Sequence, residues 1–268
     1  MSDFVAESGH WYTRAGAPAY TQIIASGKSK GKERPTTIRD ARKHNLLPSV
    51  TTIIDVLDKP ALTNWKCNRA REAALWETYQ WMMDCAPQVA EKFQGEYGLD
   101  EPDTEDKAGR GSEIHAALEQ WLGGGGIVKG YESYIIVLEE VMDEYSISIT
   151  DVVPERSFAS THGFGGAVDF STNSGQPFII DFKTKDMNAT QAKEVKAYDN
   201  HIMQLGAYRI GLGLPGATLI NLFLSRNNPD VYKVVEWSEE DAKWGEQAFL
   251  DTFQTWKSIK RYDPNGYN

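Results

Sequence analysis

Two acidic residues and a lysine in the second half of the chain have the types and the spacing of a hydrolytic site. Asp181 and Lys183 are two residues apart in FIIDFKT, so in a strand their side chains project to the same side. Asp169 lies near the end of the preceding run GFGGAVDF, one hairpin earlier. Converging carboxylates repel each other unless a cation neutralises them, and oxygen ligands suit magnesium or manganese. The spacing therefore predicts a divalent metal site, with a surface acid and an ordinary ion pair as the alternative.

The segments that carry these residues have the pattern of short strands followed by helices. The apolar run before Asp181 predicts a strand buried on both faces, where an unpaired charge is costly. Strands are expected at residues 152–158, 164–170, 177–184, 217–225 and 231–237, and helices at 107–122, 131–145, 190–212 and 238–260. This order predicts an α/β protein with a mixed central sheet flanked by helices.

The front half of the chain is expected to be mainly helical. Residues 1–46 are polar, and SGKSKGKERP has the composition of a flexible loop, so these residues are expected to form a basic arm before a single domain at 47–268. A short helix is expected from residue 50, capped by Ser49 or Thr51. A second helix is expected at residues 61–83, and its core candidates are Leu62, Trp65, Ala73, Trp76 and Met83.

Composition limits the classes of function. The 268 residues include 28 basic and 38 acidic side chains, and the net charge of −10 disfavours a protein that coats nucleic acid with its whole surface. A local basic path remains available in residues 28–43. The chain has no long apolar run and no secretory signal, so no membrane association and a cytoplasmic location are expected. Cys67 and Cys85 are too few for an iron–sulfur cluster, and we expect none.

Four motifs in order resemble the PD-(D/E)xK nuclease superfamily, in particular its RecB-like exonuclease branch, which includes phage exonucleases and the mitochondrial genome maintenance exonuclease. They are the N-terminal segment PSVTTIIDVLDKPALTNW, the helix GSEIHAALE with His115, the pair GGAVDF and DFKTK, and QLGAY with Gln204 and Tyr208. The resemblance covers roughly residues 47–225, and the order of the motifs is more specific than any one of them.

The resemblance implies roles for individual residues. His115, Asp169, Asp181 and the backbone carbonyl of Phe182 would be ligands of Mg²⁺ or Mn²⁺, and Lys183 would position or activate the attacking water. Gln204 and Tyr208, one helical turn apart, would reach the site or the nucleic-acid backbone. Without the resemblance, His115 is as well explained as a core or capping histidine, and Gln204 and Tyr208 as a pair that supports helix packing.

Other residues are weaker candidates. Glu155 lies one hairpin before Asp169 and is a candidate to support the ligands or to hold a second metal. Candidates for nucleic-acid binding are Ser112, Lys185, Lys30, Lys32, Arg34, Arg42 and Lys43. A serine near a helix start is more often a cap than a phosphate ligand, and the basic run is equally well explained as a solvated surface.

The expected protein is therefore α/β with a PD-(D/E)xK, restriction-endonuclease-like core, and its expected function is Mg²⁺-dependent exonucleolytic hydrolysis of DNA in the cytosol of a bacterium or a phage-infected host. Replication, recombination and degradation of DNA are the candidate processes. The alternatives are an endonuclease of the same fold, directed by DNA structure or sequence, and a catalytically silent nucleic-acid-binding subunit. The chain has no phosphate-binding loop of a helicase, so a helicase or a single-strand-annealing protein is a candidate partner beside DNA. The polarity of digestion, the strand preference and the oligomeric state stay open.

Overall fold

The computed structural model describes residues 9–57, 59–99 and 107–266 of the chain. It divides into two compact units, one formed by Met1–Val56 together with Ala108–Asn268 and the other by Leu57–Lys107. The expected boundary at residues 46 and 47 therefore differs from the observed division. Among the described residues, none of the helices is both long enough and apolar enough to span a membrane.

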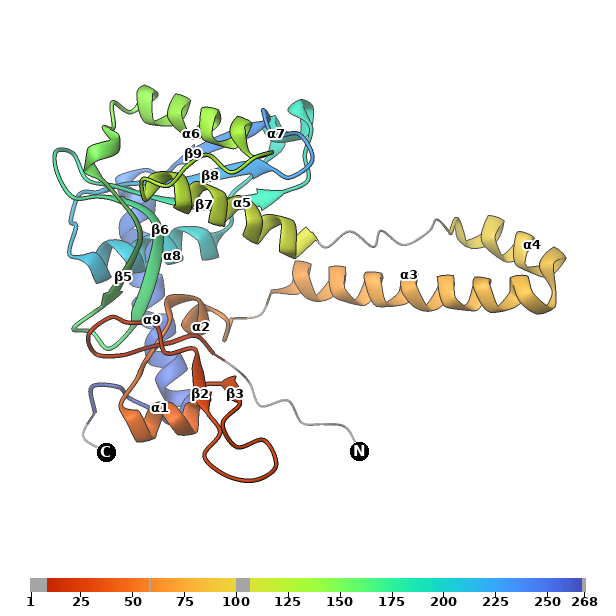
Figure 1. The fold of residues 1–268 in the computed structure, drawn as a ribbon, viewed down its shortest axis with the longest axis horizontal. Helices are drawn as coiled ribbons and strands as arrows, with labels where there is room; N and C mark the ends of the chain where they lie inside the picture. Colours follow the sequence, from red (N-terminus) through yellow and green to blue (C-terminus); the bar gives the residue numbers. More distant parts are fainter. Residues whose placement is uncertain (1–8, 58, 100–106, 267–268) are drawn as a thin grey trace. The chain divides into compact units, whose positions relative to one another are not determined.

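A five-stranded mixed sheet lies at the centre of the larger unit (Figure 1). Its strands, in spatial order, are β5 (Val152–Ala159), β6 (Gly165–Thr172), β7 (Phe178–Lys185), β8 (Thr218–Ser225) and β9 (Tyr232–Glu236). β7 and β8 are parallel, whereas the other neighbouring pairs are antiparallel. The expectation of an α/β protein with a mixed sheet is confirmed.

Helices cover both faces of this sheet. The helices α5 (Lys107–Leu122) and α6 (Glu132–Glu144) bury apolar side chains against one face, where Ile180 lies. On the other face, where Ile179 lies, pack α2 (Val50–Ile54), α8 (Asp199–Leu212) and α9 (Glu239–Lys260). Because neighbouring residues of β7 belong to opposite clusters, this strand is buried on both faces, as its apolar run predicts.

The helix expected at residues 190–212 is two helices. α7 spans Ala189–Glu194, and α8 begins at Asp199. The side chain of Asn188 accepts the backbone N–H groups of Thr190 and Gln191, and the N–H of Tyr198 donates to Nδ1 of His201. Each helix therefore has its own N-terminal cap, which a continuous helix would not need.

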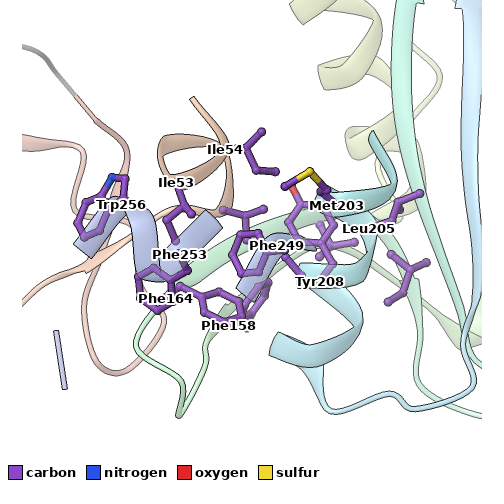
Figure 2. Packing of buried hydrophobic residues seen from close by; sticks show 14 of the residues in the cluster. Ile53, Ile54, Phe158, Phe164, Met203, Leu205, Tyr208, Phe249, Phe253 and Trp256 are labelled. Carbon is purple, nitrogen blue, oxygen red and sulfur yellow. The ribbon is translucent and has the colours of Figure 1, made fainter. Parts of the chain in front are cut away.

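Aromatic rings fill the core between α9 and the sheet (Figure 2). The ring of Phe164 lies 4.8 Å from Phe249 and 5.8 Å from Phe253 between centroids, in edge-to-face arrangements. Phe158 meets both Phe164 and Tyr208 edge to face at 6.1 Å. Such pairs each add about 0.5–1.5 kcal/mol beyond the burial of their area. This core holds α8, which carries Tyr208, against the strands that carry the acids.

The residues expected to form an arm are folded onto this core. They form β1 (Trp11–Tyr12), β2 (Thr21–Ile23), β3 (Glu33–Pro35) and α1 (Ile38–His44), and β1 pairs with β4 (Leu47–Pro48). Trp11, Ala41 and Leu46 are buried in the same cluster as α8 and α9. The hydroxyl of Tyr262 donates to the carbonyl of Leu46 at 2.6 Å. The anchoring side chains are too widely spaced in sequence to show a period, which explains why the polar composition predicted an arm.

The smaller unit consists of α3 (Pro60–Cys85) and α4 (Pro87–Tyr97). The expected helix at residues 61–83 is confirmed, but its expected core is not. Trp65, Ala73 and Met83 are exposed and Trp76 is half-buried against the ring of Tyr79, whereas the side chain of Leu62 lies outside the described part. These five positions share one face of α3 at about 100° per residue, so helical spacing predicts a buried stripe there, whereas Trp65, Ala73 and Met83 on that face are exposed.

Glycines set the spacing of α8 and α9. A Cβ atom at Gly206 would lie 2.7 Å from the backbone nitrogen of Glu246, and one at Gly245 would lie 2.7 Å from the carbonyl oxygen of Ile202. Arg209 joins the same helices by donating to Glu246 at 2.6 Å and to Glu239 at 2.7 Å. Because backbone atoms cannot rotate away, a larger residue at Gly206 must separate the helices.

We expect Gly206→Ala to lower the free energy of unfolding by about 1–3 kcal/mol, the usual range for overpacking a tight contact. Urea denaturation followed by circular dichroism measures this change. Gly95→Ala is the matched control, because a Cβ atom there meets nothing within 4 Å and alanine favours the helix. An unchanged midpoint for Gly206→Ala would contradict the assigned helix contact.

Candidate active site

The two acids stand where the pairing of β6 with β7 ends. The register pairs Ser171 with Ile179 and Phe170 with Ile180, which puts Asp169 and Asp181 next in order. There the side chain of Asp169, through Oδ2, accepts the backbone N–H of Phe182 at 2.8 Å. A side chain therefore takes the place of the backbone ladder at this level, and the two carboxylates meet at the point where the strands part.

Asp181 is buried, with an exposed fraction of 3 %, and is held by three donors. Its Oδ2 atom lies 2.7 Å from Nζ of Lys183 and accepts from Nδ2 of Asn221 at 2.9 Å, while Oδ1 accepts from Nε2 of Gln204 at 2.9 Å. Burial raises the pKa of Asp181, and the Lys183 ammonium acts in the opposite direction. The carboxylate is costly to keep here, and each of its contacts offsets part of that cost.

Gln204 and Tyr208 come to this site from α8. Besides donating to Asp181, the Gln204 amide accepts from Nζ of Lys183 at 3.1 Å and lies 2.7 Å from the Tyr208 hydroxyl. Burial, followed by the charges of Asp181 and Asp169, raises the pKa of Tyr208 well above its usual value. Tyr208 is therefore a neutral hydrogen-bonding group at neutral pH. The i, i+4 spacing places both residues on the face of α8 that meets the sheet.

His115 approaches the acids from α5. Its Nδ1 atom lies 3.8 Å from Oδ2 of Asp169, and its ring meets Phe182 edge to face at 5.9 Å. Burial by itself would lower the pKa of His115, but the carboxylates of Asp169 and Asp181 together outweigh burial and raise it. The helix is held close to the sheet, because a Cβ atom at Gly111 would lie 2.6 Å from the Thr184 hydroxyl oxygen.

Glu155 adds a third carboxylate from the edge strand β5. The register pairs Pro154 with Phe170 and Arg156 with Val168, so Glu155 lies across from Asp169. Its φ of 44° is in the left-handed region, which is strained for a residue with a side chain. Partial burial and then the charge of Asp169 raise the pKa of Glu155 to about 7. Negative charge thus accumulates on this side of Asp169.

The structure brings together eight of the residues singled out by the sequence: His115, Glu155, Asp169, Asp181, Phe182, Lys183, Gln204 and Tyr208. For Phe182 it shows the N–H bonded to Asp169. The structure shows that these residues lie together, and their types are those of a hydrolytic site. Their chemical roles stay predictions.

The residues expected to bind nucleic acid are exposed or have partners within the protein. Ser112 is exposed on α5 and Lys185 at the end of β7, and Lys30, Lys32 and Lys43 are exposed before and within α1. Arg34 bonds Asp40 at 2.6 Å and holds the pKa of that carboxyl well below its usual range. Arg42 donates to the carbonyl of Lys260 at 2.7 Å. Arg34 and Arg42 therefore have structural contacts, and a role in nucleic-acid binding stays a prediction for all seven.

Asn221 is a site residue that the sequence interpretation missed. It is fully buried in β8, directly across from Asp181 in the parallel register, and its amide oxygen accepts from Nε1 of Trp237 at 2.9 Å. One signal was available. A single amide interrupts the apolar run LINLFL, and a buried polar group in such a run needs partners.

The donor set fits a divalent metal by type, although the side chains do not stand as a finished metal site. Within residues 9–57, 59–99 and 107–266, no three His, Cys, Asp or Glu side chains form a group arranged to hold an ion. Two ligand atoms at about 2.1 Å from one ion can be at most about 4.2 Å apart, and Nδ1 of His115 and Oδ2 of Asp169 satisfy this limit at 3.8 Å. Burial is the main cause of the raised pKa values of Asp181 and Glu155, and the charge of Asp169 adds to it in both cases, so a cation near Asp169 would favour their ionised forms.

Comparisons with known proteins found little similarity. No protein-family model matches the chain, and no curated protein matches its sequence. Among solved structures, the chain is similar to SSO0001, with 15% identity over 70% of each chain and a TM-score of 0.33. It is also similar to an alkaline exonuclease from Laribacter hongkongensis, with 16% identity over 56% of this chain and 83% of the other and a TM-score of 0.30. Likeness at this level carries no argument, and the geometry of the site carries the proposal below.

Glu155→Gln tests the electrostatics of the site in the metal-free protein. A raised folded-state pKa means that the stability contributed by this carboxyl is present below its unfolded pKa of about 4.3 and is lost as pH rises through about 7. Glutamine cannot ionise, so the stability of the variant relative to wild type should increase between about pH 4 and pH 8. Urea denaturation in a chelator measures this.

Glu139→Gln, which changes an exposed acid of α6, is the control. A relative stability of Glu155→Gln that is constant across the same pH range would show that Glu155 does not carry the proposed repulsion.

Proposed function

We propose that this chain is a metal-dependent deoxyribonuclease that hydrolyses phosphodiester bonds from the ends of DNA. The observation that carries the proposal is the Asp181–Lys183 ion pair beside Asp169, at the point where β6 and β7 part. A structural ion pair would need one carboxylate. The second acid, the imidazole of His115 and the third acid Glu155 have no use in a simple pair, and they are of the types that a divalent ion takes as ligands.

His115, Asp169 and Asp181 are the residues that would hold the metal. When bound there, Mg²⁺ or Mn²⁺ would lower the pKa of water and balance the charge that develops on the phosphate oxygens. The backbone carbonyl of Phe182 completes the proposed ligand set. Glu155, facing Asp169, would support these ligands or receive a second ion.

Lys183 would act on the scissile phosphate. Its ammonium lies beside Asp181 and is held from the other side by the amide oxygen of Gln204. From that position it would turn to the phosphate oxygens, donate to them and orient the attacking water, because a preorganised donor stabilises charge that appears only in the transition state. Tyr208 would hold the Gln204 amide, which faces both Asp181 and Lys183, from α8.

The exonuclease proposal is favoured over the endonuclease by the charge of the chain. With a net charge of −10, DNA would be repelled from most of the surface, and binding would need a confined basic path. A confined basic path favours the binding of DNA ends over the binding of internal duplex. Against a catalytically silent subunit stand the intact residues His115, Asp169, Asp181 and Lys183, since a silent protein has no need to keep a buried, costly carboxylate.

Asp181→Ala and Lys183→Ala should separate metal binding from chemistry. Asp181→Ala removes a ligand, so Mn²⁺ binding by calorimetry and hydrolysis of end-labelled DNA should both be lost. Lys183→Ala should keep Mn²⁺ and DNA binding but lose at least about 100-fold in rate, the scale of losing one donor to the developing charge. The matched controls Asp143→Ala and Lys193→Ala change exposed residues of α6 and α7. Wild-type cleavage by Asp181→Ala would refute the site assignment.

Linear and covalently closed circular DNA of one sequence should differ in fate. We expect linear DNA to be degraded and covalently closed circles to survive, as measured by digestion with Mg²⁺ followed by gel electrophoresis.

Replacing Lys30, Lys32 and Lys43 by glutamine should weaken DNA binding, and the slope of log affinity against log salt should become shallower by roughly 0.7–0.9 for each lysine that binds a phosphate in the wild type. Arg34 and Arg42 are left intact because their structural contacts would confuse the result.

Rapid cleavage of the circles would favour the endonuclease alternative. An unchanged salt slope would instead mean that the three lysines belong to a solvated surface.

A further inference from the structure

Asn221 and Trp237 form a chain of hydrogen bonds that ends on Asp181. Nε1 of Trp237 donates to Oδ1 of Asn221 at 2.9 Å, and Nδ2 of Asn221 donates to Oδ2 of Asp181 at 2.9 Å. Asn221 is fully buried in β8, while Trp237 directly follows β9 and is half-buried. The two residues therefore lie behind Asp181, in the part of the sheet away from His115 and Glu155.

The indole decides which way the amide faces. A tryptophan N–H can only donate, so the atom of Asn221 that meets it must be the oxygen. The NH₂ group of Asn221 is then turned toward Asp181 and cannot flip without leaving two buried groups unpaired. The Trp237 contact thus fixes a donor against the carboxylate.

Asn221 differs from the other donor on the same oxygen. Oδ2 of Asp181 also meets the Lys183 ammonium, which is carried on a long flexible side chain and is 26 % exposed. If Lys183 turns to a phosphate, as the proposed function requires, Oδ2 loses that partner. Asn221 is short, neutral and clamped, so it stays in place.

We propose that Asn221, clamped by Trp237, is a positioning residue that keeps the Asp181 carboxylate in its working orientation when Lys183 engages the substrate. This inference rests on the proposed function and deepens it. Partners that orient a metal ligand from behind are commonly worth 10–100-fold in metal affinity or activity. Neither residue touches the substrate in this proposal.

Asn221→Leu, a replacement of similar volume, removes the donor. Mn²⁺ affinity by calorimetry and kcat on end-labelled DNA should each fall about 10- to 100-fold, with KM within twofold of wild type. A residue that only satisfied its own burial would change the melting temperature and leave both quantities unchanged. Wild-type Mn²⁺ affinity and kcat in Asn221→Leu would overturn the proposal.

Trp237→Phe removes the clamp alone and decides the matter if Asn221→Leu does not fold. We expect a smaller loss of several-fold in kcat and in Mn²⁺ affinity. The matched control is Trp244→Phe, which changes a tryptophan that lines the same surface hollow as Trp237 but is 49 % exposed on α9. Equal kcat and equal Mn²⁺ affinity in Trp237→Phe and Trp244→Phe would overturn the proposal.

A third measurement is independent of nuclease activity. The ¹H–¹⁵N resonance of the Trp237 indole, assigned from its absence in Trp237→Phe, should move in Asp181→Asn and stay in place in Glu139→Gln. An unchanged chemical shift of the Trp237 indole in Asp181→Asn would refute the chain of hydrogen bonds from Trp237 to Asp181. A wild-type protein that shows the coupled resonance but does not cleave DNA would refute the proposed function while leaving the link between Trp237 and Asp181 standing.

Discussion

The buried carboxylate of Asp181, close to the second acid Asp169, is the constraint on which the arrangement of the larger unit depends. An ionised carboxylate removed from water costs several kcal/mol unless its oxygens are satisfied. Here a lysine and two amides meet it, and each comes from a different place: Lys183 from the same strand, Gln204 from α8 and Asn221 from β8. The sheet and the helix must therefore meet at one point with little tolerance, and the close glycine contact of α8 with α9 and the aromatic core around Phe164 hold them there.

The parallel pair in the mixed sheet requires a crossover connection, which an all-antiparallel sheet would not need. Because β8 runs parallel to β7, Asn221 lies beside Asp181, and the connection between these strands carries α7 and α8 over the face of the sheet. Gln204 and Tyr208 thus reach Asp181 from a helix that the crossover itself requires. On the other side of β7, the end of pairing with β6 leaves room for Asp169 to turn to the Phe182 N–H and for His115 to approach from α5. The parallel pairing of β7 with β8 therefore positions the residues that support Asp181, and the end of the antiparallel pairing of β6 with β7 leaves room for the other acid and the histidine.

Local patterns were enough to predict the five strands of the central sheet and most of the helices that cover it. The spacing of Asp181 with Lys183 and of Gln204 with Tyr208 also predicted which side chains share a face. Three things could not be predicted that way. The partnership of Asn221 depends on the register of β8, which is a long-range property. The packing of Trp11 and Ala41 depends on a surface formed by α9, more than two hundred residues later. The exposure of Trp65 in α3 is the third, because a tryptophan in a helix is ordinarily buried.

The acidic residues of the site lower the stability of the fold in positions where they would serve the proposed reaction. Asp181 and Glu155 have raised pKa values and Glu155 has a strained backbone, and these features destabilise the folded state. A chain selected only for stability would replace such acids with neutral or apolar side chains, as buried ion pairs can often be replaced without destabilising the fold. Retained repulsion of this kind is expected where a positively charged ligand relieves it on binding. The same negative charge would strengthen the hold of the site on a divalent cation, and Lys183, which pairs with Asp181, would then be able to turn to the phosphate.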